Sequence, residues 1–305
     1  MMTEVIPYIS FVGFLFGSTL VVSRFSVGQY APSTYIGLRL VIASLGHLSL
    51  YVLLNKRYKW PRNGRLWFHA SVLGVLGTSI PMTAIVSSLQ YLSSGVAAVL
   101  ITTTPAITVV LAHFFLPDES LTRLKGIGVL LAFSGTILLA GSGESGLSDI
   151  NRANPLGYGL MLIAVLAGSS AVIYIRKYLG GYKSYDIASI RMFVAALVVM
   201  PLSTLIVGMD LSGVTAEGYM ALVYAALMGT FGGLLMTVYN IKRFGATAAV
   251  MTAYIIPIVA GIGGVLFLDE QITPIMIVGM MLIIGGVAII NRAQATAVAG
   301  LVPGD

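Results

Sequence analysis

Residues 95–119 read GVAAVLITTTPAITVVLAHFFLPDE, and residues 247–270 read TAAVMTAYIIPIVAGIGGVLFLDE. Each stretch is apolar for about 20 residues, the length that an α-helix needs to cross the hydrocarbon core of a bilayer. Each carries one proline near its middle, Pro105 or Pro257, and each ends in Asp-Glu. The two stretches therefore predict the same membrane-spanning element, present twice in one chain.

The similarity extends over residues 32–142 and 184–292, at a spacing of about 152 positions that shortens by one residue after the prolines. The other equivalent pairs are Arg39 and Arg191, Gly77-Thr78 and Gly229-Thr230, Asp118-Glu119 and Asp269-Glu270, Gly128 and Gly279, and Gly135 and Gly286. Duplicated sets of membrane helices that are interrupted at matching positions are typical of transporters.

The composition requires lipid as the solvent. The chain is 57% hydrophobic and 9% charged, with a mean hydropathy of +0.95, whereas soluble domains contain about 25% charged residues. There is no cysteine, and the three histidines have no metal-ligand spacing, so we expect neither a cofactor nor a metal. The net charge of +6 comes from short loops between apolar runs, which indicates membrane topology rather than nucleic-acid binding.

Apolar runs between glycine, proline and charged residues predict ten membrane helices. They lie near residues 5–26, 32–55, 67–91, 94–116, 124–142, 156–178, 184–207, 216–239, 245–268 and 274–291. With the N-terminus in the cytoplasm, the inner side holds 13 lysines and arginines and the outer side only Arg24 and Arg152. The positive-inside rule therefore predicts that both termini are cytoplasmic, in a multi-pass protein of the inner (plasma) membrane.

Five helices per repeat is an odd number, so the second repeat must enter the membrane in the opposite orientation. The predicted fold class is an all-α membrane protein with ten transmembrane helices arranged as a 5+5 inverted repeat. We expect a first repeat at residues 1–142, an extracytoplasmic linker at 143–155, a second repeat at 156–292 and a cytoplasmic tail at 293–305.

The second part of each repeat resembles the EamA family of the drug/metabolite transporter superfamily. The resemblance is carried by Gln90–Gly95, Pro105 and Leu116–Glu119 in one copy, by Arg243–Thr247, Pro257 and Phe267–Glu270 in the other, and by the glycine-rich helices that follow. Phe16-Gly17-Ser18 stands where the family often has Trp-Gly-Ser. The resemblance implies a transporter fold but no particular substrate, because the same pattern is similar to exporters of amino acids, nucleosides and drugs.

Two arginines are candidate functional residues, because each lies about seven residues inside a predicted span. Arg39 and Arg191 would each cost about 3 kcal/mol or more if they faced lipid, so each must face protein or a wet cavity. They could bind free carbonyl groups at a neighbouring helix break, or they could hold an anionic group such as a carboxylate. Inversion places them in opposite halves of the membrane, and a single central site would not need both, so we expect the structural role.

Polar residues at predicted helix breaks are the candidates for lining a substrate cavity. Prolines free a carbonyl group one turn earlier, and in a membrane that group must face protein or water. The predicted cavity residues are Thr78, Ser79, Thr102, Thr103, Pro105, Thr230, Tyr254 and Pro257. The alternative is that the hydroxyl groups bond back to their own helices. Glu119 and Glu270 fall at helix ends, and there we expect helix capping or salt bridges between the repeats.

The leading functional hypothesis is a secondary transporter, acting as an exporter of small metabolites such as amino acids, with a midplane cavity exposed alternately to each side. The alternative is a transporter of a phosphorylated or other anionic metabolite that uses Arg39 and Arg191. An integral membrane enzyme is disfavoured, because the spans contain no nucleophile–base pair or metal motif. The expected partners are a small-molecule substrate and the lipid bilayer, with no nucleic acid; a homodimer is compatible with the sequence.

Overall fold

The computed structural model describes residues 2–117, 119–150, 152–244 and 252–299. This part of the chain is helical and contains no strand. The elements are α1 (Met2–Val27), α2 (Pro32–Leu53), α3 (Gly64–Gly74), η1 (Val75–Ser79), α4 (Ile80–Ser88), α5 (Ser94–Ile101), α6 (Thr104–Phe115), α7 (Arg123–Ser142), α8 (Pro155–Tyr178), α9 (Ser184–Ile206), α10 (Ala216–Tyr224), η2 (Ala225–Gly232), α11 (Gly233–Phe244), α13 (Thr252–Leu268) and α14 (Pro274–Ala299).

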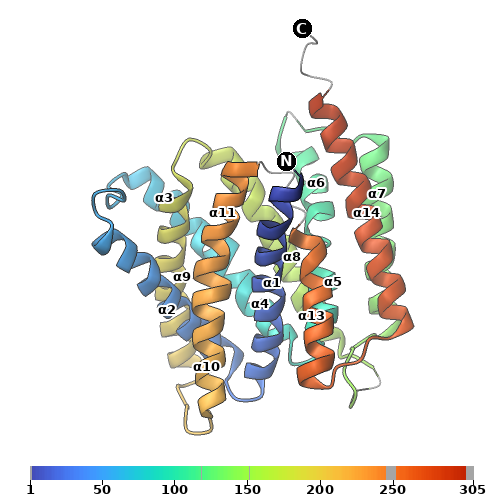
Figure 1. Ribbon diagram of the computed structural model, residues 1–305, viewed down its shortest axis with the longest axis horizontal. Coiled ribbons are helices and arrows are strands. Elements are labelled where there is room, and N and C mark those ends of the chain that lie inside the picture. The colour runs from blue at the N-terminus through green and yellow to red at the C-terminus, as the bar shows by residue number, and fades with distance from the viewer. Residues whose placement is uncertain (1, 118, 151, 245–251, 300–305) are drawn as a thin grey trace.

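Nine helices of the described residues are long and apolar enough to span a membrane. Three of these helices are composite: α3, η1 and α4 continue one another, as do α5 and α6, and as do α10, η2 and α11. A tenth apolar helix, α13, is shorter at 17 residues, and the first residues of its predicted span, 245–251, lie outside the described residues. The helices form one bundle, with the start of α1 and the end of α14 at the same face (Figure 1).

We call this face the terminal face, and the opposite face, where α7 ends and α8 begins, the linker face (Figure 1). The starts of many helices are set by local chemistry. Pro32 opens α2 and Pro155 opens α8, positions where the missing N–H group costs nothing. Side chains cap others: Asn63 accepts from the Leu66 N–H before α3, and Thr122 from the Lys125 N–H before α7.

Helices α7 and α14, which are equivalent in the two repeats, pack closely through glycines. A Cβ atom on Gly128 would lie 2.6 Å from the carbonyl oxygen of Gly286, and one on Gly135 would lie 2.7 Å from that of Gly279. Small residues allow membrane helices to approach each other this closely. Since Gly128 corresponds to Gly279 in the repeat but contacts Gly286, the two equivalent helices run antiparallel, which is the relation that an inverted repeat requires.

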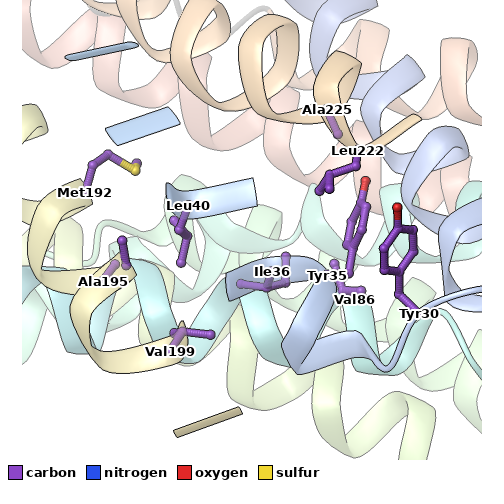
Figure 2. Close-up of a cluster of buried hydrophobic side chains, with 11 residues drawn as sticks. Tyr30, Tyr35, Ile36, Leu40, Val86, Met192, Ala195, Val199, Leu222 and Ala225 are labelled. Carbon is purple, nitrogen blue, oxygen red and sulfur yellow. The ribbon is translucent and has the colours of Figure 1, made fainter. Parts of the chain in front are cut away.

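A second pair of equivalent helices, α2 and α9, forms much of the apolar core. Figure 2 shows side chains from α2, α4, α9, α10 and η2 pointing into one cluster. Tyr35, Ile36 and Leu40 of α2 are fully buried there, against Met192 and Ala195 of α9. The core therefore lies between the repeats rather than within either one, and it places the two arginine-bearing helices beside each other.

The helix that contains Pro105 is broken, whereas its repeat equivalent is not. Pro105 follows a break between α5 and α6, while Pro257 lies inside the continuous helix α13. Before Pro105, the hydroxyl groups of Thr102, Thr103 and Thr104 donate to the carbonyl groups three residues earlier, each at 2.6 Å. Hydroxyl groups that bond back in this way compete with the helical ladder, and the residues before Pro257 are not three threonines.

Candidate functional site

The Gly-Thr pairs that occur in both repeats lie in π-helical turns. Gly77 and Thr78 belong to η1, and Gly229 and Thr230 belong to η2. Such turns often mark functional sites, because a wider turn leaves backbone groups without their usual partners. Two hydroxyl groups donate hydrogen bonds to backbone carbonyl groups at these turns. Ser79 donates to the carbonyl of Gly74 at 3.1 Å, and Thr230 donates to the carbonyl of Ala225 at 3.2 Å.

Each of the two arginines reaches the π-helical turn of the other repeat. Arg39 donates from Nε to the hydroxyl of Thr230 at 2.6 Å, and Arg191 donates from Nε to the hydroxyl of Thr78 at 2.8 Å. Since Arg39 corresponds to Arg191 and Thr230 to Thr78, the two contacts exchange when the repeats are exchanged. The arginines and the Gly-Thr turns thus form one site that both repeats build.

The remaining contacts of the two arginines differ. Nη2 of Arg191 donates to the carbonyl of Gly77 at 2.8 Å, and this is the carbonyl that Pro81 deprives of its helical partner. Nη1 of Arg39 donates to the hydroxyl of Ser23 at 3.2 Å, and the Ser23 hydroxyl lies 3.4 Å from that of Tyr35. A guanidinium group has five N–H donors, so these contacts leave donors on both arginines.

Both arginines line a single cavity of about 360 Å³, which we call the central cavity. Its polar wall consists of Thr19, Ser23, Arg39, Gly77, Thr78, Arg191, Gly229 and Thr230. Its apolar wall consists of Phe16, Leu20, Ile36, Met82, Ile85, Val86, Ile101, Met192, Leu234 and Ile256. A mostly apolar pocket with a few convergent polar groups is typical of sites for small ligands.

The sequence places the two arginines in opposite halves of the membrane and predicts a structural role for both, because a single central site would not need both; in the structure, both line one cavity. The two residues enter from opposite halves of the bundle, but their long side chains point to the same space between α2, α9 and the two π-helical turns. Thr78 and Thr230 line this cavity as well. Nothing in the sequence distinguishes Ser23, because it is one serine in an apolar helix.

A second cavity of about 430 Å³ lies beside the central one, and we call it the adjoining cavity. The two share the wall residues Phe16, Ile101 and Ile256. Pro105 lines the adjoining cavity, together with Thr104, Thr108, Thr237, Asn291 and Gln294. Asn291 and Gln294 belong to the part of α14 near the terminal face (Figure 1), so the adjoining cavity lies between the central cavity and that face.

The other predicted cavity residues do not line the central cavity. Thr103 lines a separate pocket beside α8, and its hydroxyl bonds back to its own helix. Thr102 also bonds back, and Ser79 bonds to its own turn. Tyr254 accepts a hydrogen bond from the Asn291 amide at 2.8 Å, and Pro257 is buried inside α13. The structure thus brings Thr78 and Thr230 together with the arginines, and disperses the rest.

The two glutamates lie at opposite faces of the bundle. At the linker face, Glu270 accepts hydrogen bonds from the backbone N–H of Ser94 at 2.8 Å and from its hydroxyl at 2.7 Å, at the start of α5. Arg24 lies 4.0 Å from the same carboxylate. Since Glu270 belongs to the second repeat and Ser94 to the first, this cap joins the repeats.

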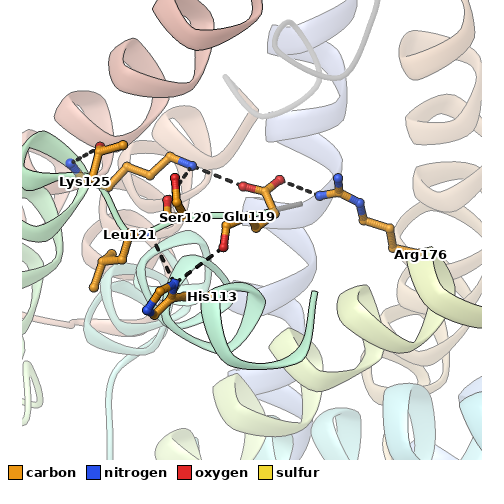
Figure 3. Close-up of polar contacts among 7 residues, drawn as sticks. His113, Glu119, Ser120, Leu121, Lys125 and Arg176 are labelled. Atoms are coloured by element: carbon orange, nitrogen blue, oxygen red, sulfur yellow. Dashed lines mark hydrogen bonds and ion pairs between the residues drawn. The ribbon is translucent and has the colours of Figure 1, made fainter. Parts of the chain in front are cut away.

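At the terminal face, Glu119 forms ion pairs instead (Figure 3). Its carboxylate lies 2.5 Å from Nη1 of Arg176 on α8 and 3.1 Å from Nζ of Lys125 on α7. Burial acts to raise the pKa of Glu119, but hydrogen bonds from Arg176 and Lys125 outweigh it, and the pKa falls below the ordinary 4.5. Burial raises the pKa of Glu270, and the hydrogen bonds from Ser94 and Gly95 oppose it only in part.

Comparison with known proteins identifies the family. The model of the EamA-like transporter family matches residues 4–141 and again residues 155–292. The chain belongs to this family, and it is a multi-pass membrane transporter whose family domain occurs twice.

Individual relatives support the same class. The chain is 26% identical to an uncharacterized transporter of Archaeoglobus fulgidus, over 89% of this chain and 92% of the relative. It is 27% identical to the uncharacterized inner membrane transporter YedA of Escherichia coli, over 82% of this chain and 80% of YedA. A solved crystal structure with 20% identity shares the fold, with a TM-score of 0.65 over 97% of this chain and 98% of that one.

Proposed function

We propose that this protein is a secondary transporter of the inner (plasma) membrane that exports small metabolites by alternating access. In this proposal, residues 1–142 and 156–292 are inverted five-helix units, joined by an extracytoplasmic linker at 143–155. Both termini and the tail at 293–305 are cytoplasmic, so the terminal face is the cytoplasmic one. The family resemblance makes amino acids one class of substrate to test.

The observation that carries this proposal is the exchange of contacts between the repeats around one cavity. Arg39 bonds Thr230 as Arg191 bonds Thr78, and Gly128 meets Gly286 as Gly135 meets Gly279. Such pairs are expected of two units related by a two-fold axis in the membrane plane. Rocking of one unit against the other would then expose the central cavity to each side in turn.

The arrangement of the two faces supports a state that opens toward the terminal face. The adjoining cavity leads from the central cavity toward that face, while at the linker face Glu270 holds α5 of the other repeat. No GxxxxGK[ST] sequence for nucleotide phosphates exists in the chain. We therefore propose that solute gradients, rather than ATP hydrolysis, drive transport, and that the protein is not an enzyme.

Purified protein in liposomes loaded with radiolabelled metabolites, amino acids among them, tests the transport proposal. The expected result is saturable efflux of at least one metabolite that is absent from liposomes without protein. The double variant Thr78→Val with Thr230→Val should reduce the rate. The control Ser134→Ala, at an exposed helix position away from the cavity, should leave it unchanged. Failure to move any member of a broad panel, with folded protein, would contradict the proposal.

Topology is open to a separate test because the chain contains no cysteine. Single cysteines at Asp149, in the linker, and at Lys59, in the loop before α3, both replace exposed residues. In intact cells, a membrane-impermeant maleimide should label Asp149→Cys but not Lys59→Cys. Labelling of both from the outside would rule out the proposed orientation.

A further inference from the structure

We propose that the central cavity selects an organic anion with an apolar body and without a cationic group. This inference rests on the proposed transport function and narrows it to a substrate class. Such a substrate corresponds to the alternative that the sequence leaves open, an anionic metabolite bound by Arg39 and Arg191.

The positive charges of the central cavity have no negative partner in its described wall. The central cavity is lined by two guanidinium groups, and its wall as described contains no acidic residue. All eleven acidic residues of the sequence lie in predicted loops or within the first turn of a predicted span, away from the middle of the membrane. Within the described residues, no carboxylate forms an ion pair with either arginine. Buried cations without a counter-ion are costly, and an anionic ligand would offset that cost.

The N–H donors of Arg39 and Arg191 have a fixed direction in the cavity. The partners of Arg39 and Arg191 that line the cavity are neutral hydroxyl groups and one carbonyl, so the full positive charge of each arginine is retained. The side chains are held in place by Thr230 and Thr78, which fixes their direction before a ligand arrives. Guanidinium groups with free N–H donors match carboxylate and phosphate oxygens. Two of them can accommodate up to two negative charges.

The remainder of the cavity wall is apolar. Phe16, Ile36, Met82, Met192 and Ile256 surround the polar end with apolar surface, so the rest of the ligand should be apolar. The wall as described holds no carboxylate to pair with an ammonium group. A zwitterionic amino acid would therefore bury its ammonium group beside two cations, which repels it. The geometry favours organic acids or phosphate monoesters over amino acids and amines.

Equilibrium binding of radiolabelled phenylacetate to the purified protein in detergent tests this inference. Unlabelled competitors share the phenyl body but differ in charge: phenyl phosphate, phenylalanine, phenylacetamide and phenethylamine. Phenylacetate or phenyl phosphate should compete at least about tenfold better than the neutral, zwitterionic and cationic probes, the factor expected from one charge-assisted hydrogen bond. The ranking of phenylacetate against phenyl phosphate distinguishes a carboxylate site from a phosphate site.

Variants assign the selectivity to the arginines. Arg39→Gln with Arg191→Gln should abolish the preference for anions, while Arg39→Lys with Arg191→Lys should retain part of it. The control is Arg62→Gln with Arg65→Gln, which removes two exposed positive charges around the start of α3 and should leave binding unchanged. If the glutamine variant does not fold, the competition series on the unmodified protein still decides the question.

The outcomes separate this inference from the proposed function. Equal or stronger competition by phenylalanine, phenylacetamide or phenethylamine would overturn the substrate class and leave the transporter proposal intact. Absence of binding by both anions at millimolar concentration, with folded protein, would also overturn it. Anion-selective binding without any transport in liposomes would support the site and contradict the transporter proposal instead.

Discussion

Glu119 and Glu270 end the same Asp-Glu sequence in the two repeats, yet they make different contacts. Glu270 is only 5% exposed and accepts hydrogen bonds at the start of α5. Glu119 is more exposed and binds the cations Lys125 and Arg176. The sequence makes the two positions equivalent, so the difference arises from the packing around them. Both contacts join the repeats, Glu270 by capping α5 and Glu119 by its ion pair with Arg176 of α8.

The helix residues that shortly precede the two glutamates also differ between the repeats. Gly264 and Ala112 each stand seven residues after the repeat proline. A Cβ atom on Gly264 would collide with the Glu270 carboxylate, which folds back over the helix. Ala112 carries a Cβ atom at the equivalent place, where Glu119 instead points to Arg176 (Figure 3). A glycine is needed only where the glutamate caps the other repeat.

The largest expected effect is the loss of this cap. Glu270→Ala would leave the N–H groups of Ser94 and Gly95 without their acceptor in a buried place, while the Ser94 hydroxyl keeps the Ala260 carbonyl. The loss should cost about 2–4 kcal/mol of unfolding free energy. Glu119→Ala breaks two ion pairs. Arg176 is 48% exposed, and Lys125, although only 6% exposed, keeps the Ser120 carbonyl as an acceptor, so the loss should be smaller, about 1–2 kcal/mol. Unfolding in detergent measures both, and equal losses would remove the distinction between the two faces.

At the central cavity, unlike at the two glutamates, equivalent substitutions in the two repeats should lower the unfolding free energy equally. Thr78→Val and Thr230→Val each remove the acceptor of one arginine Nε, which should cost about 1.5–3 kcal/mol of stability. Thr103→Val is the control, because its hydroxyl bonds only to its own helix, and it should cost less than either. Thermal unfolding of the three variants tests this, and a large difference between Thr78→Val and Thr230→Val would show that the site is not shared equally.

A substitution at Gly264 tests the contact between α13 and the Glu270 carboxylate. Gly264→Ala would displace the Glu270 carboxylate and should cost about 1–3 kcal/mol of unfolding free energy through overpacking. The control Ala112→Gly should cost about 1–2 kcal/mol, through helix propensity and the loss of one buried methyl group. In the double variant Gly264→Ala with Glu270→Ala, the alanine at position 264 should cost less than it does alone, because only the Ser94 hydroxyl oxygen, at 2.8 Å, then remains too close to its Cβ atom. Additive losses in a double-mutant cycle would argue against direct contact.

The smallest expected effect is a difference between Glu119 and Glu270 in how their contributions to the unfolding free energy depend on pH. The folded-state pKa of Glu119 is lowered below 4.5, so its contribution to stability is present above 4.5 and is lost as the pH falls below that value. The pKa of Glu270 is raised above 4.5, so stability should increase as the pH falls toward 4.5. Unfolding midpoints of the unmodified protein, Glu119→Gln and Glu270→Gln across this pH range should give differences of opposite slope. The same slope for both would contradict the assignment.

The sequence predicted most helix boundaries closely, for a physical reason. A span needs about 20 apolar residues, and Pro32, Pro155 and Pro274 mark where spans begin. The candidate site was harder to predict. Pro81 points to Thr78, and the repeat points to Thr230 as the equivalent of Thr78. The prolines of the two other helices also predict Thr103 and Tyr254 in the cavity, but the structure gives these two residues partners elsewhere.

The amino-acid sequence alone determined that this chain is a duplicated set of membrane helices, because apolar length and repeated residues are properties of the chain itself. It also indicates that Arg39 and Arg191 face protein or a wet cavity, because lipid cannot solvate them. Only the tertiary structure decided that both reach one cavity, each bound to the threonine of the other repeat, and that Glu270 caps a helix while Glu119 forms ion pairs. Those facts depend on how the two repeats pack against each other, and neither repeat encodes them by itself.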